Sequence, residues 1–470
     1  MIMIKFPTSL RLLTAFTYAG LTAFAHEEES APGAKQTEAA AVSATAAHAH
    51  DMLTRMCDDF GGRLSGSTAN EAALNRLADE LRALSLEPQR QEFSMPGWER
   101  GVDRVTMTAP FDRTLRAAAM GYSPATAPVS GRLVSIGRGD ESDWPEGDLS
   151  GAIGLVASGS RGSTGQLAQH AADRGFAALL MINREAGGQL LMRTGSYSGE
   201  GLPVPTFTIT VEEGRWIERL LARGTEVIVE VESTSRPREM KSANLVVTLP
   251  GKSPERVIVG AHFDSWDLGQ GAIDNGLGIA QVFALAAELR GRELARTVEL
   301  VWFNGEEQAL WGSRHAATAL GDAPVVAMVN LDMVGVPIAV NALGFDSLVP
   351  ALERWNNARG GQKLPQGVLN SNWLGSDHVP YQLVGVPTVT FHAPIPRESV
   401  RYYHDFADTM DKLSVSLLAE SSAVITDLVE ALANDTSLEP RRSSDEEIKA
   451  FFIRDGHDER LQRMGWWKFD

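Results

Sequence analysis

Seven polar residues in the second half of the sequence have the types and positions of a metal site. Two histidines and five carboxylates lie at the ends of predicted strands or in the loops that follow, at His262, Asp264, Asp274, Glu306, Glu307, Asp332 and His404. Histidine nitrogen and carboxylate oxygen are ligands that divalent cations take in proteins. Carboxylates that are grouped together repel one another unless a cation neutralises them. The set therefore predicts a site for a hard or borderline divalent cation.

The size of this set suits two cations. Five protein ligands, one of them shared, give three ligands to each of two metal ions roughly 3.5–4 Å apart. A water that bridges the pair has a lowered pKa, and a further carboxylate takes its proton and passes it to a leaving amine. Of the adjacent Glu306 and Glu307, one can bind metal while the other faces the water. Asp264 is placed to receive the N–H of His262, which would orient that ring.

The elements that must position these residues form a regular α/β pattern from residue 242 onward. Apolar, β-branched segments predict strands, and longer apolar segments between them predict helices. Because strands alternate with helices, we expect a largely parallel sheet covered on both faces, with its ligands at the carboxyl ends of the strands. The predicted strands are 244–249, 257–261, 297–303, 325–333 and 388–392, and the predicted helices are 276–289, 310–320 and 413–432.

Residues 111–235 differ from this pattern and predict a separate β-rich module. They are rich in Gly, Ser and short apolar strands, and they contain no cluster of histidines and carboxylates. The catalytic domain is accordingly predicted from residues 51–110 and 236–435. The charged segment 436–470 is a C-terminal tail to which the sequence assigns no role.

The N-terminus indicates export. Lys5 and Arg11 precede the apolar run 12–21, which is followed by small residues at 23–25, and this order is typical of a signal peptide over 1–25. Residues 26–50 are predicted to be a flexible leader. The expected location is the periplasm or the secreted fraction, without a stable membrane anchor. Cys57 is the only cysteine, which excludes an intramolecular disulfide and a cysteine-rich zinc site.

The charge balance excludes one class of partner. The formal net charge is −17, and an acidic protein is repelled by nucleic acid backbones and anionic membranes. No nucleic acid partner is therefore expected, whereas an acidic protein is well suited to concentrating metal cations.

The motifs around these residues resemble those of the co-catalytic zinc exopeptidases related to aminopeptidase Y and bacterial leucyl aminopeptidase. Residues 260–276 are similar to the block that holds the first ligand and the bridging ligand, and residues 303–307 to the block of the paired glutamates. Residues 330–335 resemble the third block, and His404 with Asp408 and Thr409 resembles the last. Within the family, residues 265–271 favour the carboxypeptidase Q (plasma glutamate carboxypeptidase) branch. The likeness covers most of residues 51–435, including a protease-associated insert.

This resemblance implies a fold, a cofactor and a role for each residue. The implied fold is a three-layer α/β/α zinc-exopeptidase domain with a mainly parallel mixed sheet, plus an inserted β-rich protease-associated domain. The resemblance implies two Zn²⁺ per chain, whereas the spacing alone shows no metal identity. It further implies that Glu306 is the general base and acid and that Asp264 supports His262. One zinc would be held by His262, Asp274 and Asp332, and the other by Glu307, Asp274 and His404.

The expected function is an exported metallo-exopeptidase that hydrolyses peptide bonds at the end of peptides or in dipeptides. The preference for an amino or carboxyl end stays open, as does homodimer formation. One alternative is an amide hydrolase that acts on acyl-amino acids. Another is a non-catalytic binding protein on the same fold. That class predicts lost ligands, and all of them are present here.

Overall fold

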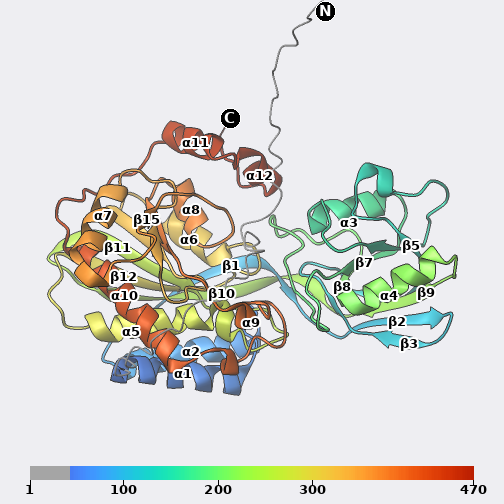
Figure 1. The fold of residues 1–470 in the computed structure, drawn as a ribbon, viewed down its shortest axis with the longest axis horizontal. Coiled ribbons are helices and arrows are strands. Elements are labelled where there is room, and N and C mark those ends of the chain that lie inside the picture. The colour runs from blue at the N-terminus through green and yellow to red at the C-terminus, as the bar shows by residue number, and fades with distance from the viewer. Residues whose placement is uncertain (1–42, 470) are drawn as a thin grey trace, which may run out of the picture. The chain divides into compact units, whose positions relative to one another are not determined.

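The computed structural model describes residues 43–469, which fold around two eight-stranded sheets. The predicted signal peptide and most of the predicted leader lie outside the described residues. The first sheet is formed by residues that the sequence assigns to the catalytic domain, and the second by residues of the insert together with residues 103–109 (Figure 1).

The first sheet is mixed, with parallel strands at its centre. Its strand order is β1-β10-β12-β11-β13-β16-β14-β15. The pairs β12–β11, β11–β13 and β13–β16 are parallel, whereas β1–β10 and β10–β12 are antiparallel. The bounds are β1 Gln89–Glu99, β10 Arg236–Leu249, β11 Ser253–His262, β12 Arg296–Phe303, β13 Val325–Asn330, β14 Ala339–Asn341, β15 Val368–Leu369 and β16 Thr388–His392.

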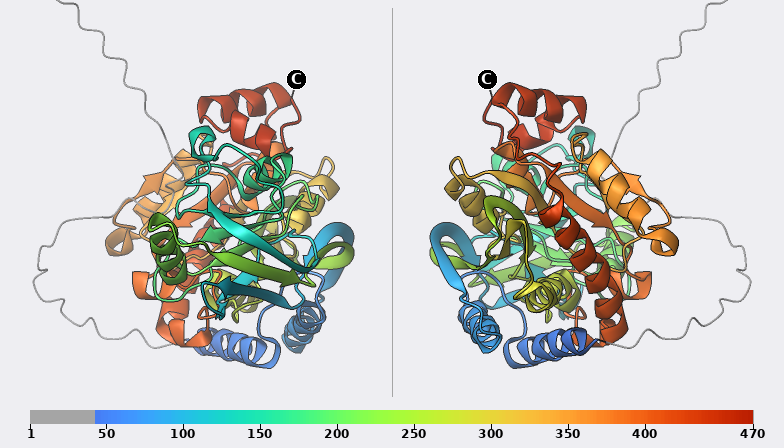
Figure 2. Two further views of the ribbon diagram at one scale, coloured as in Figure 1. Left: turned by 90° about the vertical axis from the view of Figure 1, so that its right-hand side faces the viewer. Right: turned by 90° about the vertical axis from the view of Figure 1, so that its left-hand side faces the viewer.

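Helices cover both faces of this sheet, as the alternating pattern predicts. On one face, α1 (Ala44–Phe60), α5 (Leu277–Leu289) and α10 (Val415–Asn434) pack against one another and on the strands. On the other face lie α6 (Trp311–Ala319) and α8 (His378–Leu383) (Figures 1 and 2). The three-layer α/β/α architecture with a mixed sheet is thus confirmed.

Helix α2 (Thr68–Ala83) extends the layer formed by α1, α5 and α10. Helix α7 (Val349–Ala358) packs beside β15, at the edge of the sheet. The central helix α5 is apolar on all sides and buried, as expected for a helix enclosed by a sheet and other helices. By length and composition the stretch Ala272–Leu289 would suffice to cross a membrane, but 89% of it is buried inside the protein. Its burial is that of a core helix.

The insert is built on the second sheet, with the strand order β3-β2-β9-β5-β6-β7-β8-β4. The helices α3 (Thr164–Asp173) and α4 (Val211–Ala222) pack on it. Its strands are β2 Asp103–Ala109, β3 Arg113–Leu115, β4 Ala117–Ala119, β5 Thr126–Ser135, β6 Ile153–Val156, β7 Ala178–Ile182, β8 Thr206–Ile209 and β9 Ile228–Ser233. The insert has an apolar core of its own, separate from that of the first sheet.

The structure shifts two of the predicted boundaries and adds helices to the predicted tail. Strand β2 pairs with β3 and β9, so the insert begins before residue 111 and includes residues that were assigned to the catalytic domain. Helix α1 begins at Ala44, so the last residues of the predicted leader are helical, capped by the Ser43 side chain. The tail forms α11 (Asp445–Arg454) and α12 (Asp458–Arg463), whose apolar residues join a small cluster with residues around α6 and α8.

Candidate metal centre

The carboxyl ends of three parallel strands bring the predicted residues to one edge of the first sheet. His262 is the last residue of β11, Glu306 and Glu307 follow the end of β12, and Asp332 follows the end of β13. Adjacent parallel strands end on the same side, so their following residues meet there. The structure therefore brings together the residues that the sequence predicted at this edge.

Asp274 lies between the two predicted metal histidines. Its Oδ1 is 3.0 Å from His262 Nε2, and its Oδ2 is 2.9 Å from His404 Nε2. Each carboxylate oxygen thus faces a different ring, which is the arrangement that a carboxylate shared by two cations requires. Asp274 is only 4% exposed, so water does not compensate its charge.

The remaining two predicted ligands lie on either side of this pair. Glu307 Oε2 is 3.0 Å from His404 Nε2, and Asp332 Oδ1 is 3.5 Å from His262 Nε2. Donor atoms of His262, Asp274 and Glu307 all lie within 4.8 Å of one another. All five predicted ligands are therefore neighbours in a single cluster, in which Asp332 and His404 are only partly buried.

The tautomers of the histidines show that this cluster fits a cation. His262 Nδ1 is 2.9 Å from the backbone carbonyl of Asp264, and His404 Nδ1 is 2.8 Å from that of Met192. Since a carbonyl only accepts hydrogen bonds, each Nδ1 carries the proton. In a neutral ring, Nε2 then directs a lone pair at the Asp274 carboxylate. Two acceptors at such distances require a positive charge between them, whether a proton or a metal ion.

The electrostatics of the cluster agree with this requirement. Burial raises the pKa of Glu307 to about 7, because its charged form has lost water and the neighbouring Asp274 is negative. Burial opposes the charged form of His404, but Glu307 and Asp274 outweigh it and raise the pKa of His404 to about 10. The raised pKa of His404 shows that the negative charge of its neighbours outweighs burial, and a divalent cation would neutralise that charge.

The two adjacent glutamates have different surroundings. This difference indicates which of them would bind metal and which would face the water, a choice that their spacing alone left open. Glu307 is buried and its carboxylate faces His404, whereas Glu306 is only partly buried. Burial together with the charges of Glu307 and Asp332 raises the pKa of Glu306 well above its ordinary value. A carboxyl group with a raised pKa beside a metal cluster has the properties of a proton acceptor and donor.

Asp264 does not contact His262 in the way that the sequence predicted. The bond to His262 Nδ1 comes from the backbone carbonyl of Asp264, and its carboxylate lies 3.9 Å from that nitrogen. The carboxylate instead accepts the backbone N–H groups of Glu306 at 3.2 Å and Glu307 at 3.3 Å. Asp264 is fully buried, and burial raises its pKa to about 6. Its side chain therefore holds the glutamate loop, while its backbone orients the histidine.

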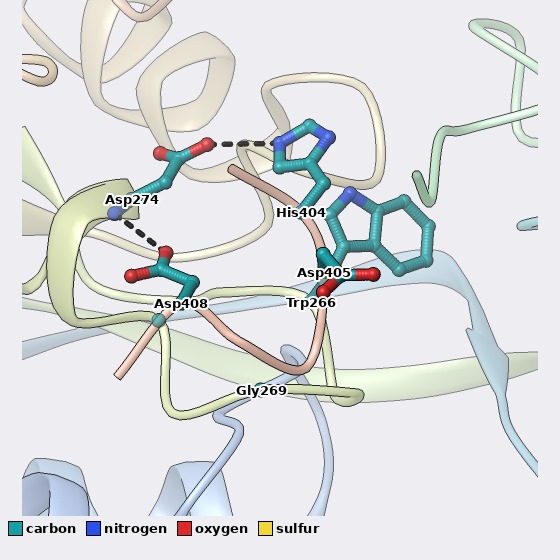
Figure 3. Close-up of a pocket in the computed structure, with 7 residues that line it drawn as sticks. Trp266, Gly269, Asp274, His404, Asp405 and Asp408 are labelled. Carbon is teal, nitrogen blue, oxygen red and sulfur yellow. Dashed lines mark hydrogen bonds and ion pairs between the residues drawn. The ribbon is translucent and has the colours of Figure 1, made fainter. Parts of the chain in front are cut away.

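The glycine-rich loop that carries Asp274 is held from two sides. Asp408 accepts the backbone N–H of Ile273 at 2.7 Å and that of Asp274 at 3.0 Å (Figure 3). Arg63, which is fully buried, donates to the carbonyls of Gln270 at 2.6 Å and Gly271 at 2.9 Å. The sequence placed Asp408 in a family motif but indicated no such function for either residue, because their partners are backbone groups.

The insert contributes to the site, which the sequence did not predict. The carbonyl of Met192 binds His404, and Met192 lies in the insert, in the loop between β7 and β8. Trp266, next to the ligand loop, packs in the apolar core of the insert with its ring 6.1 Å from that of His404 (Figure 3). A backbone carbonyl has no residue-type signal, so only the fold reveals the contact.

Comparison with known proteins confirms the predicted resemblance. Residues 244–429 match the sequence model of Peptidase family M28. Aminopeptidase YwaD of Bacillus subtilis is 26% identical over 399 residues, which cover 81% of this chain and 83% of that protein. Carboxypeptidase Q of Bos taurus is 30% identical over 281 residues, covering 56% of this chain and 59% of that protein. The chain thus matches a little over half the length of that relative.

A solved structure shares the fold. BSAP, a zinc aminopeptidase from Bacillus subtilis, superposes with a TM-score of 0.69 and 22% sequence identity, covering 86% of this chain and 99% of BSAP. The superposition covers more of the chain than the 244–429 segment, so the shared fold extends beyond the residues that match the family model.

Proposed function

Since this chain is a metallopeptidase with a Peptidase family M28 domain over residues 244–429, we propose that it removes amino acids from the ends of peptides or cleaves dipeptides. The position of Asp274 carries the proposal, because its two oxygens face two different histidines at 3.0 and 2.9 Å. That arrangement suits two cations that share one carboxylate. The named aminopeptidase and carboxypeptidase relatives support an exopeptidase.

The residues that would hold the ions fall into two groups. His262, Asp274 and Asp332 would hold one zinc, and Glu307, Asp274 and His404 would hold the other. When bound, two zinc ions lower the pKa of a water molecule and polarise the carbonyl that it attacks. Imidazole and carboxylate donors without cysteine fit zinc, and the relation to a zinc aminopeptidase supports that metal.

Glu306 would move the proton of the reaction. Its carboxylate takes a proton from the attacking water and then gives it to the nitrogen of the leaving amine. The raised pKa of Glu306 favours this exchange, because burial and the neighbouring carboxylates make its carboxylate a stronger base. Asp264 keeps Glu306 in place through the backbone N–H groups of the glutamate loop.

We also propose that the enzyme is exported to the periplasm or the medium. The support is the signal-peptide pattern of residues 1–25, which lie outside the described residues. The protease-associated character of the insert is likewise a proposal, supported by the sequence likeness of residues 111–235.

The experiment that tests the function measures metal content and amino acid release together. Purified mature protein is analysed for zinc per chain, and release is measured on dipeptides, on aminoacyl-anilides and on carboxyl-terminal peptides. We expect two zinc ions and an activity that chelators remove. An absence of tightly bound metal, with no activity after zinc, cobalt or manganese is added, would refute the proposal.

A further inference from the structure

The segment that carries His404 is fastened to the insert at both of its ends. At its start, Gln189 Nε2 donates to the carbonyl of Arg401 at 2.7 Å, and Arg401 Nη2 donates to the carbonyl of Ala186 at 2.7 Å. At its end, the Asp405 carboxylate accepts the backbone N–H of Leu190 at 2.7 Å. All three partners from the insert lie in the loop 183–205, between β7 and β8.

Between these fasteners, His404 itself forms a reciprocal pair with Met192. The backbone N–H of Met192 donates to the His404 carbonyl at 3.1 Å, and His404 Nδ1 donates to the Met192 carbonyl at 2.8 Å. Met192 is fully buried, and Gln189 and Asp405 are at most 3% exposed. Water therefore offers these groups no replacement partner, so losing one bond would leave a buried polar atom unsatisfied.

The backbone at His404 explains why external support is needed. His404 has a φ of 61°, in the left-handed region that residues with a side chain rarely adopt. Such a conformation persists only where the surrounding structure holds it. The loop 183–205 supplies this support. His404 lies between α9 (Arg397–Val400) and α10, so no strand of the first sheet holds it.

We propose that the insert is a working part of the metal centre, and that the loop 183–205 positions His404 as a ligand of one metal ion. The inference rests on the proposed two-metal function. The Met192 carbonyl fixes the tautomer and orientation of the ring, so that Nε2 faces Asp274 and Glu307. Gln189 and Asp405 are positioning residues, because they fasten the segment on either side of His404. The ion held by His262 and Asp332 does not depend on this loop.

The loop offers a matched control for this idea. Glu212, an exposed residue of α4, accepts the backbone N–H of Gly187 at 2.6 Å and that of Gly188 at 3.1 Å. These bonds support the same loop, but they do not reach the segment that carries His404. Glu212→Gln therefore perturbs the loop without removing a fastener of His404.

The test is a metal titration of the full mature chain after its metal has been removed with a chelator. Zinc binding is followed by calorimetry and cobalt binding by absorption, in wild type, Gln189→Ala, Asp405→Asn and Glu212→Gln. We expect Gln189→Ala and Asp405→Asn to weaken one of two ions by about 10–100-fold, the usual effect of losing an outer partner of a ligand. The other ion keeps its affinity, and Glu212→Gln binds both ions as the wild type does.

The outcomes separate this inference from the function on which it rests. If Gln189→Ala and Asp405→Asn both bound two metal ions with wild-type affinity, the inference would be overturned and the proposed function would stand. Equal weakening of both ions would also overturn it, because a general loss of structure would explain that result. A wild type that binds fewer than two ions would overturn the two-metal proposal and the inference with it. Gln189→Ala keeps the test decisive if Asp405→Asn does not fold.

Discussion

The two halves of the proposed metal centre are built in different ways. His262 and Asp332 lie at the ends of paired parallel strands, so the first sheet alone places them. His404 lies on a loop in a left-handed conformation, and the Met192 carbonyl in the loop 183–205 holds its ring. One half of the proposed site therefore follows from the sheet edge, while the other, by our inference, depends on the loop 183–205. One set of candidate ligands thus combines residues placed by paired strands with a residue placed by loop contacts.

The largest effect should come from the residue that the two halves share. Asp274→Ala removes the carboxylate that faces both His262 and His404. We expect both ions to lose more than the roughly 100-fold that loss of an outer partner causes, with turnover lost in parallel. Metal titration and amino acid release measure these two effects. If one ion kept its wild-type affinity, Asp274 would belong to one half alone.

Glu306→Gln should separate chemistry from metal binding in both halves. The amide cannot accept the proton, so we expect turnover to fall by about 10²–10⁴-fold. Metal content should stay near the wild-type value, because Glu306 is assigned to no ion. Turnover on a dipeptide and zinc per chain are the two measurements. The exposed Glu293, paired with Lys252, provides the control Glu293→Gln.

Asp264→Asn should act on the glutamate loop more than on the His262 half. The carboxylate accepts two backbone N–H groups, and an amide would present its NH₂ to one of them. We expect turnover to fall by about 10–100-fold, the range for losing an outer partner. The affinity of the His262 ion should change little, because a backbone carbonyl orients that ring. A selective loss of that ion would show that the carboxylate orients His262 after all.

The same contrast explains what the sequence could and could not predict. His262, Glu307 and Asp332 follow β-branched, apolar strands, so alternation of strands and helices was enough to place them at one edge. His404 follows no strand, and only its motif indicated it. Backbone carbonyls and N–H groups form the contacts of Met192, Arg63 and Asp408. Such groups are common to all residue types, so the contacts leave no pattern in the sequence. For Asp264 the sequence predicted the correct neighbour but the wrong atom, because the path of the chain after β11 decides which oxygen faces the ring.

The smallest effect should come from the packing between the insert and the ligand loop. Gly121 lies in the insert, and a Cβ there would be 2.7 Å from the Trp266 ring, which is buried and 6.1 Å from the His404 ring. Gly121→Ala must therefore push Trp266 or the backbone beside it. We expect a destabilisation of roughly 1–3 kcal/mol, the usual range for overpacking, observed as a lower thermal unfolding midpoint.

The matched control for this substitution is Gly361→Ala, since a Cβ at Gly361 meets no atom within 4 Å. If the insert adjusts the His404 half, Gly121→Ala should also weaken one ion slightly and leave the other unchanged, whereas Gly361→Ala should alter neither. Equal unfolding midpoints in the two variants would mean that the contact between Trp266 and the insert is loose. The His404 half would then depend on the hydrogen bonds of the loop 183–205 and not on this packing.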